Sequence, residues 1–195
     1  PLFTLTPIRD VMHRPDQLPD AITGPAAWLG ADMAVRQDEW LIQLSERDIA
    51  DLERASNHYL SLGRDVGEIT AEDFPLETFG AHLERMKEKL LHGIGFEVLR
   101  GLPADEYDQL FSATVFCGIG AHLGSARSQN AQGHILGHVR DTGASSANPN
   151  TRIYLTAERQ SFHTDSADIV GLLCLQDASF LAAARRAIFE DVSEV

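Results

Sequence analysis

Residues 75–103, PLETFGAHLERMKEKLLHGIGFEVLRGLP, decide the fold class because they join a helix pattern to a strand pattern. Apolar residues recur at intervals of three and four at Leu76, Phe79, Leu83, Met86 and Leu90. This spacing predicts an amphipathic helix that ends near Gly93. The segment GIGFEVLRGLP then predicts a short strand, closed by Gly101 and Pro103. A helix is therefore followed directly by a strand in the middle of the chain.

Helix patterns lie on both sides of this stretch, and strand patterns follow them. Ser45, with acidic residues in the next turn, predicts the start of a helix over residues 45–62. Asp105 predicts the start of another helix, which continues to about Leu123. Beyond it, short apolar or alternating runs separated by Gly, Asn, Asp and Ser predict strands and turns. This order predicts an α+β fold, with helices packed on one side of a sheet or barrel.

The two ends of the chain differ from this central part. Residues 1–44 predict a loop-rich arm, which Trp28 and Trp40 anchor onto the body. Residues 45–178 form the main domain. Residues 179–195 form a divergent tail that is rich in alanine and expected to be helical, with the helix over residues 178–192.

Composition narrows the class of protein. The chain has 195 residues and a net charge of −13, and no run of Lys or Arg exceeds two residues. This argues against binding to nucleic acid or to anionic membrane surfaces. No stretch of eighteen apolar residues and no N-terminal signal pattern occur. Cys117 and Cys174 both stand in apolar surroundings, which predicts two small core residues and a reduced, cytoplasmic location.

The segment QSFHTDSADIVGLLCLQ, residues 160–176, carries the main chemical hypothesis. His163 and Asp165 precede an apolar run, residues 169–175, that predicts a buried strand. On extended backbone, residues two apart project from one face about 6–7 Å apart. A nitrogen and an oxygen ligand can then meet one metal ion, as two members of a 2-His-1-carboxylate triad do. The alternative is a hydrogen-bonded His/Asp pair at a strand end.

Spacing alone is a weak signal, because His82 and Glu84 have the same separation. They fall in the amphipathic helix, where residues two apart point away from each other, so a solvated helix face is expected for them. His134 and His138 are expected on a strand, about 13 Å apart and too distant for one ion. They are interpreted as surface or pocket-wall histidines.

Several segments resemble the taurine dioxygenase-like (TauD/TfdA-like) family, in particular its fungal members. They are GIGFEVLRGLP, GIGAHLG, QNAQGHILGHVRDTG and TRIYLTAERQSFHTDSADIVGLLCLQ, within residues 75–178. The resemblance implies a double-stranded β-helix, which is a jelly roll of the clavaminate synthase-like type, and Fe(II) with 2-oxoglutarate as co-substrate. It also implies that His163 and Asp165 are the first two iron ligands and that the substrate is a small molecule. Asn130 and Tyr154 are candidates for pocket lining.

The chain departs from that family after Asp165. The family implies a second histidine ligand and a 2-oxoglutarate-binding arginine far downstream. This chain has no later histidine, and its only later arginines are Arg185 and Arg186. The stretch LQDASF stands where a Gly-Gly-Glu/Asp-Ser/Thr stretch is expected. We therefore expect missing C-terminal strands, through truncation, a misread coding sequence or a genuine short form.

Two hypotheses from different classes remain open. The first is a dioxygenase by descent, with the catalytic half lost from this sequence. If the chain alone were active, His122, His134 and His138 would be the first candidates for a third ligand. The second is a non-catalytic remnant or interaction module, whose open sheet edges pair with a partner chain or with a second copy of itself.

Overall fold

The structure is a computed structural model. It describes residues 2–4, 21, 23–130, 132–145, 147, 151–159, 163, 165 and 167–176. The expected helix over residues 178–192, most of the loop-rich arm before residue 21, and Thr164 lie outside the described residues.

The described chain mixes helices and short strands, which confirms the α+β class. In chain order the elements are β1 (Leu2–Thr4), α1 (Gly30–Ala34), α2 (Gln37–Trp40), β2 (Leu41–Gln43), α3 (Glu46–Ser61), the 3₁₀ helix η1 (Val66–Glu68), α4 (Gly80–His92), β3 (Val98–Arg100), α5 (Gln109–Leu123), β4 (Ser125–Arg127), the 3₁₀ helix η2 (Ile153–Leu155) and β5 (Ile169–Val170).

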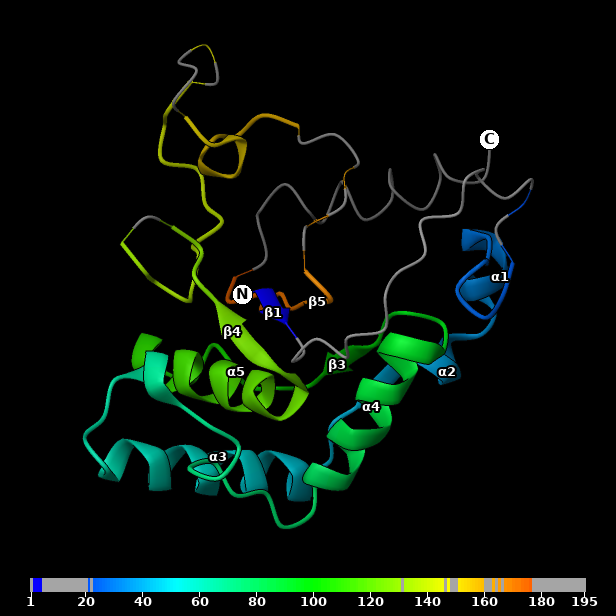
Figure 1. Cartoon of the computed structure of the whole chain (residues 1–195). Helices are drawn as coiled ribbons and strands as arrows, with labels where there is room; N and C mark the ends of the chain where they lie inside the picture. Colours follow the sequence, from blue (N-terminus) through cyan, green and yellow to red (C-terminus); the bar gives the residue numbers. More distant parts are fainter. Residues whose placement is uncertain are drawn as a thin grey trace, which may run out of the picture.

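The long helices α3, α4 and α5 lie together in the lower part of Figure 1, and the strands β4, β1 and β5 lie above α5. Helix α5 packs on α3 and α4 on one side and contacts β4 on the other. Strand β1 pairs antiparallel with both β4 and β5, giving the order β4-β1-β5, and β2 pairs parallel with β3. Helices therefore pack beside a sheet as expected. The double-stranded β-helix and its missing strands remain predictions.

The helix ends follow local capping chemistry, and two starts differ from the predictions. Ser45 caps α3 as predicted, since its Oγ accepts from the Asp48 N–H at 3.2 Å and Asp48 accepts from the Ser45 N–H at 2.9 Å. Helix α4 ends at His92, before Gly93, as predicted, but it begins at Gly80 rather than near residue 75. The prediction that Asp105 opens α5 was wrong, because the Asp108 carboxylate accepts from the Phe111 N–H at 2.7 Å.

The predicted anchoring of the N-terminal part is confirmed by two indole contacts. The Trp28 indole donates to the Ile94 carbonyl at 2.8 Å, and its ring lies 5.0 Å from the ring of Phe96. The ring of Trp40 lies 5.5 Å from the same Phe96 ring. Aromatic contacts thus tie the segment around α1 and α2 to the turn before β3.

Helix α5 is the centre of the core because it is covered on several sides. Its buried positions include small and polar residues as well as apolar ones, which lets neighbouring elements approach closely. The core side chains around it are Leu44, Leu52, Ala55, Tyr59, Phe74, Phe79, Leu83, Met86, Val115, Leu123 and Ile169. Residues from all three long helices and from β5 therefore share one core.

Gly118 on α5 gives the sharpest test of this packing. A Cβ added there would lie 2.5 Å from three ring carbons of the fully buried Phe74. Overpacking at that contact costs about 3 kcal/mol, and the higher helix propensity of alanine returns about 1 kcal/mol. We expect Gly118→Ala to lower the free energy of unfolding by about 2 kcal/mol in a urea titration. Gly80→Ala is the matched control, because its nearest atom is 3.5 Å away, and equal effects of the two changes would contradict the packing argument.

The β-region is more irregular than the sequence patterns suggested. The strand expected around His134 and His138 is absent from residues 132–145, so that prediction was wrong. Gly133 has φ +87°, and the Gln129 N–H donates to the His134 carbonyl at 2.7 Å, so local turns use these backbone groups. Further along, the backbone N–H of Arg140 donates to the Tyr154 carbonyl.

The buried strand predicted over residues 169–175 is also largely wrong. Only Ile169 and Val170 pair with β1, which is itself three residues long. Ile169 is buried, but Leu172 is 83% exposed, and the thiol residue Cys174 is exposed rather than part of the core. Cys117 is buried as predicted, and burial raises the pKa of its thiol to about 11.

In the ranges that the structure describes, no helix is long and apolar enough to cross a membrane.

Candidate functional site

The structure places His163 and Asp165 just before β5, with their side chains near each other. Nε2 of His163 lies 3.8 Å from Oδ1 of Asp165. Their side chains are 48% and 42% exposed, so the pair lies at the surface of the described part of the chain. Asp168, three residues further on, is exposed as well. An imidazole nitrogen and a carboxylate oxygen thus stand close enough to approach one small ligand.

The donor atoms of this pair, one nitrogen and one oxygen, suit a divalent transition metal. The distance between them is slightly wide for two ligands of one ion. Two ligands at right angles, with bonds of about 2.1 Å, stand about 3.0 Å apart. A side-chain adjustment of about 1 Å would bring the two atoms to that separation, which exposed side chains make readily. No set of three His, Cys, Asp or Glu that could hold a metal occurs among the residues described here. Among the described residues, His163 and Asp165 are therefore a pair of candidate donors and not a complete three-ligand group.

Of the three histidines considered as a third ligand, two lie in other contacts and one is exposed. His122, on α5, has its Nε2 2.9 Å from the Phe74 carbonyl, and the ring edge meets the Phe74 ring. Nδ1 of His134 lies 2.9 Å from the side-chain amide of Asn130, and His138 is exposed. The structure thus brings none of the three into a metal-binding group with His163 and Asp165 within the described residues.

Asn130 and Tyr154, the candidates for pocket lining, have local contacts. The Asn130 Oδ1 accepts from the backbone N–H groups of Gln132 and His134, both at 3.1 Å. Tyr154 lies in η2, and its carbonyl accepts from the Arg140 N–H at 3.1 Å. Asn130 therefore holds a turn, while Tyr154 joins η2 to the segment after His138.

His82, interpreted from sequence as part of a solvated face, belongs to a buried charge cluster. Its Nε2 lies 2.7 Å from Oε1 of Glu97, whose side chain is fully buried. Lys89 binds the other oxygen of Glu97 and also donates to the Glu39 carbonyl at 2.8 Å. Glu84 is exposed, and residues two apart on a helix point away from each other, so the side chains of His82 and Glu84 do not converge. The solvated-face interpretation was wrong for His82 because Glu97 approaches it from outside α4.

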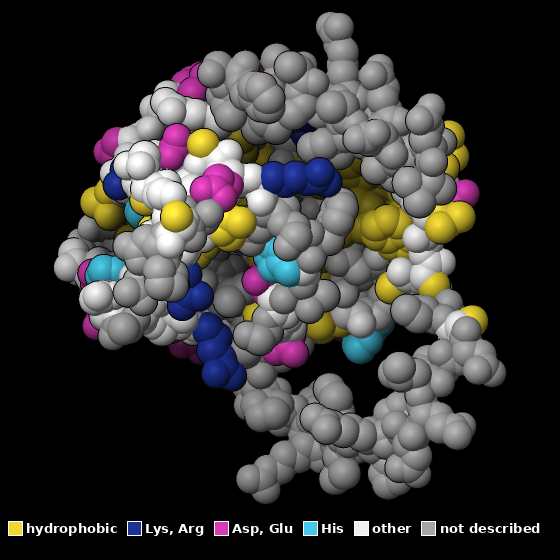
Figure 2. All heavy atoms as spheres, turned by 90° about the horizontal axis from the view of Figure 1, so that it is seen from above, with side chains coloured by type: hydrophobic (Ala, Val, Ile, Leu, Met, Phe, Trp, Pro, Cys, Tyr) yellow, Lys and Arg dark blue, Asp and Glu magenta, His cyan; other side chains and the backbone are white. Residues whose placement is uncertain are grey.

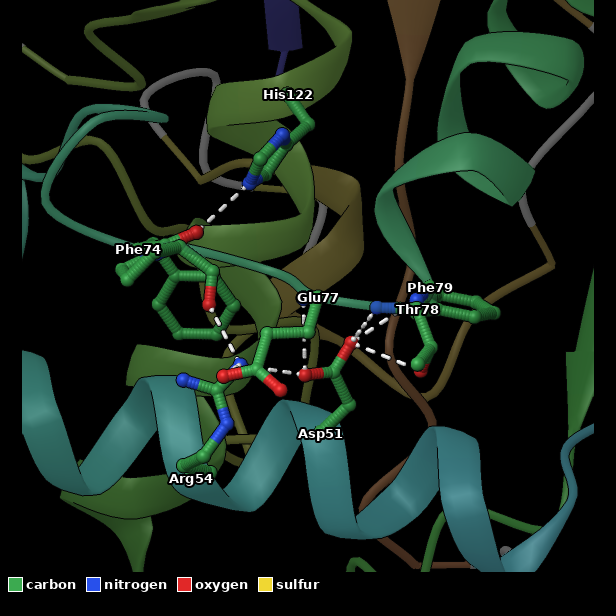
Figure 3. A network of polar contacts seen from close by, with 8 residues as sticks. Asp51, Arg54, Phe74, Glu77, Thr78, Phe79 and His122 are labelled. Carbon is green, nitrogen blue, oxygen red and sulfur yellow. Dashed lines mark hydrogen bonds and ion pairs between the residues drawn. The ribbon is translucent and has the colours of Figure 1, made fainter.

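A second buried carboxylate, Asp51 of α3, was missed from sequence altogether (Figure 3). It accepts from the backbone N–H groups of Glu77, Thr78 and Phe79 at 3.1, 2.8 and 2.9 Å, and from Arg54 at 2.6 Å. Burial raises the pKa of Asp51, but these donors lower it more, so the net shift is well below the ordinary value. The carboxylate therefore stays ionised and holds the start of α4 to α3.

The face seen from above the first view carries charges of both signs (Figure 2). Described Lys and Arg side chains lie near Asp, Glu and His side chains on this face, and hydrophobic side chains gather right of its centre.

Comparison with known proteins identifies relatives for nearly the whole chain, although no protein-family model matches it. The chain is 33% identical over 158 residues to FR-33289 synthase of Streptomyces rubellomurinus (strain ATCC 31215), covering 80% of this chain and 46% of that protein. It is 31% identical over 193 residues to taurine hydroxylase-like protein SAT17 of Stachybotrys chartarum (strain CBS 109288 / IBT 7711), covering 93% of this chain and 50% of that protein. The chain thus spans about half the length of these curated relatives. Over the length that they match, the chain belongs to the taurine dioxygenase-like family.

Proposed function

We propose that this chain provides the metal-binding His-x-Asp segment of an Fe(II)- and 2-oxoglutarate-dependent dioxygenase that acts on a small molecule. The observation that carries the proposal is the pair His163 and Asp165, whose donor atoms stand 3.8 Å apart in a chain related to a taurine hydroxylase-like protein. The bound metal would supply activation of O₂, coupled to oxidative decarboxylation of 2-oxoglutarate.

Each of the two residues has a distinct part in this proposal. His163 offers a neutral nitrogen ligand, and Asp165 offers an anionic oxygen that offsets part of the positive charge of the ion. Both side chains are close to half exposed, so solvent reaches them. The third protein ligand and the arginine that would bind 2-oxoglutarate are proposed to come from residues outside this sequence, as the half-length match to both relatives suggests.

Metal binding at the pair can be tested without turnover. We expect the chain to bind Co(II), used as a spectroscopic substitute for Fe(II), weakly and in a one-to-one ratio. Removing one of two protein ligands should weaken binding at least about tenfold, so His163→Ala and Asp165→Ala should each have this effect. Binding is measured by titration followed by visible absorption.

His138→Ala is the matched control, because it removes an exposed histidine from another loop of the same region. Its Co(II) affinity should equal that of the unmodified chain. If all three variants bind Co(II) equally well, the pair is no metal site, and the interaction-module hypothesis gains.

A further inference from the structure

A cavity of about 410 Å³ lies apart from the His163/Asp165 pair, between η1, α4, α5 and β4. Its walls combine apolar side chains with a few polar ones. Ile69, Ala121 and Ile135 supply apolar surface, while Lys87, His122 and Ser125 supply polar groups. Its volume lies within the range of small-molecule sites, which are about 300–1,000 Å³ and combine apolar walls with a few convergent polar groups.

Lys87 provides the charge of this cavity. It is half-buried on α4, and among the described residues the α4 side chains that form ion pairs are His82 and Lys89, both with Glu97. Lys87 lines the cavity, and no carboxylate of the described chain forms an ion pair with it. A half-buried ammonium attracts a ligand anion more strongly than an exposed one does, because less water screens it.

The other groups limit how much negative charge the cavity accepts. Glu68 also lines it, but its carboxylate is 60% exposed and lies 3.7 Å from Arg64, which offsets its charge. The carboxyl end of α5, at Leu123 and Gly124, carries partial negative charge. His122 has its Nε2 engaged with the Phe74 carbonyl, so its neutral form presents an acceptor at Nδ1. One free cation among these groups suits one carboxylate and disfavours a dianion.

We propose that this cavity binds a small monocarboxylic acid with an apolar body. The carboxylate lies at Lys87, within reach of the Ser125 hydroxyl, and the apolar body lies against Ile69, Ala121 and Ile135. This site is separate from the metal pair and needs no metal.

Hexanoate is the probe, titrated into the 195-residue chain in the presence of EDTA, which keeps metal-dependent carboxylate binding out of the measurement. Binding is followed by the backbone amide shifts of residues 124–126, with a Kd expected on the order of 1 mM for so small a ligand. Hexanol, which has the same apolar body without charge, and adipate, which adds a second carboxylate, should each bind about tenfold more weakly.

Lys87→Met removes the ammonium and keeps an apolar stem, so the Kd for hexanoate should rise about tenfold or more. Arg85→Met is the matched control, because it removes one positive charge from an exposed position two residues away on the same helix. Ala121→Leu should abolish binding by filling the cavity, provided that the amide spectrum shows a folded chain. His163→Ala should leave the Kd unchanged.

Three results would overturn the proposal. Equal affinity for hexanoate and hexanol would rule out recognition of charge. An unchanged Kd in Lys87→Met, with shifts that persist, would place the carboxylate elsewhere. Shifts that fail to appear at residues 124–126 would place the ligand outside the cavity.

Discussion

Replacing Asp51 by alanine is expected to lower the free energy of unfolding by about 3–5 kcal/mol, the cost of breaking a buried charged network from one side. The carboxylate is 5% exposed and satisfies three backbone N–H groups at the start of α4. Alanine leaves these donors without an acceptor, and it leaves Arg54 without its closest partner. Because the donors precede Gly80, the loss should loosen α4 against α3 rather than unwind α3 itself.

Chemical unfolding monitored by far-UV circular dichroism measures this effect. Asp105→Ala is the control, since that carboxylate is exposed and caps no helix, and it should stay within about 0.5 kcal/mol of the unmodified chain. A loss below about 1 kcal/mol for Asp51→Ala would show that the network contributes little.

The same carboxylate gives a pH dependence whose direction is set by its lowered pKa. The folded chain holds Asp51 ionised to lower pH than the unfolded chain does, where its pKa is about 3.9. The contribution of Asp51 is therefore complete above that value and is lost as pH falls below it. In Asp51→Asn, the slope of stability against pH below about pH 4 should be smaller than in the unmodified chain.

Local patterns predicted the helices well because capping and apolar spacing act over a few residues. Ser45 and Asp48 form a reciprocal cap within four residues, and Gly93 ends α4 where the apolar period stops. The start of α4 was misplaced because the acceptor for its first donors, Asp51, lies 26–28 residues earlier on another helix. Likewise, His82 forms a hydrogen bond with Glu97, which lies beyond the end of α4, and the residue pattern within α4 does not predict this contact.

The β-region and the candidate site were harder to predict for a related reason. A strand needs a partner, and β1 pairs with only two residues of the apolar run after Asp165. Apolar composition alone therefore overstated the burial of Leu172 and Cys174. The proximity of His163 and Asp165 needed only their two-residue spacing. The Lys87 cavity instead joins η1, α4 and the α5–β4 segment, which lie well apart in the sequence.

Joining this chain to the second half of a relative is expected to raise succinate formation at least a hundredfold. The 195-residue chain alone, given Fe(II), ascorbate and 2-oxoglutarate, should form no measurable succinate. It lacks a histidine after Asp165 and a distant downstream arginine. An arginine–carboxylate contact is worth about 1.5–3 kcal/mol, or one to two decades in affinity, and the missing ligand adds to that deficit.

The chimera carries the C-terminal half of the Stachybotrys chartarum relative after Gln176, and its succinate formation should vanish in His163→Ala and persist in His138→Ala. Succinate from the unfused chain that disappears in His163→Ala would show instead that a third ligand lies within these 195 residues. His122, His134 and His138 would then be the first to replace. Succinate from the chimera that survives His163→Ala would remove His163 from the metal site, because an iron ligand contributed by this chain must be needed for turnover.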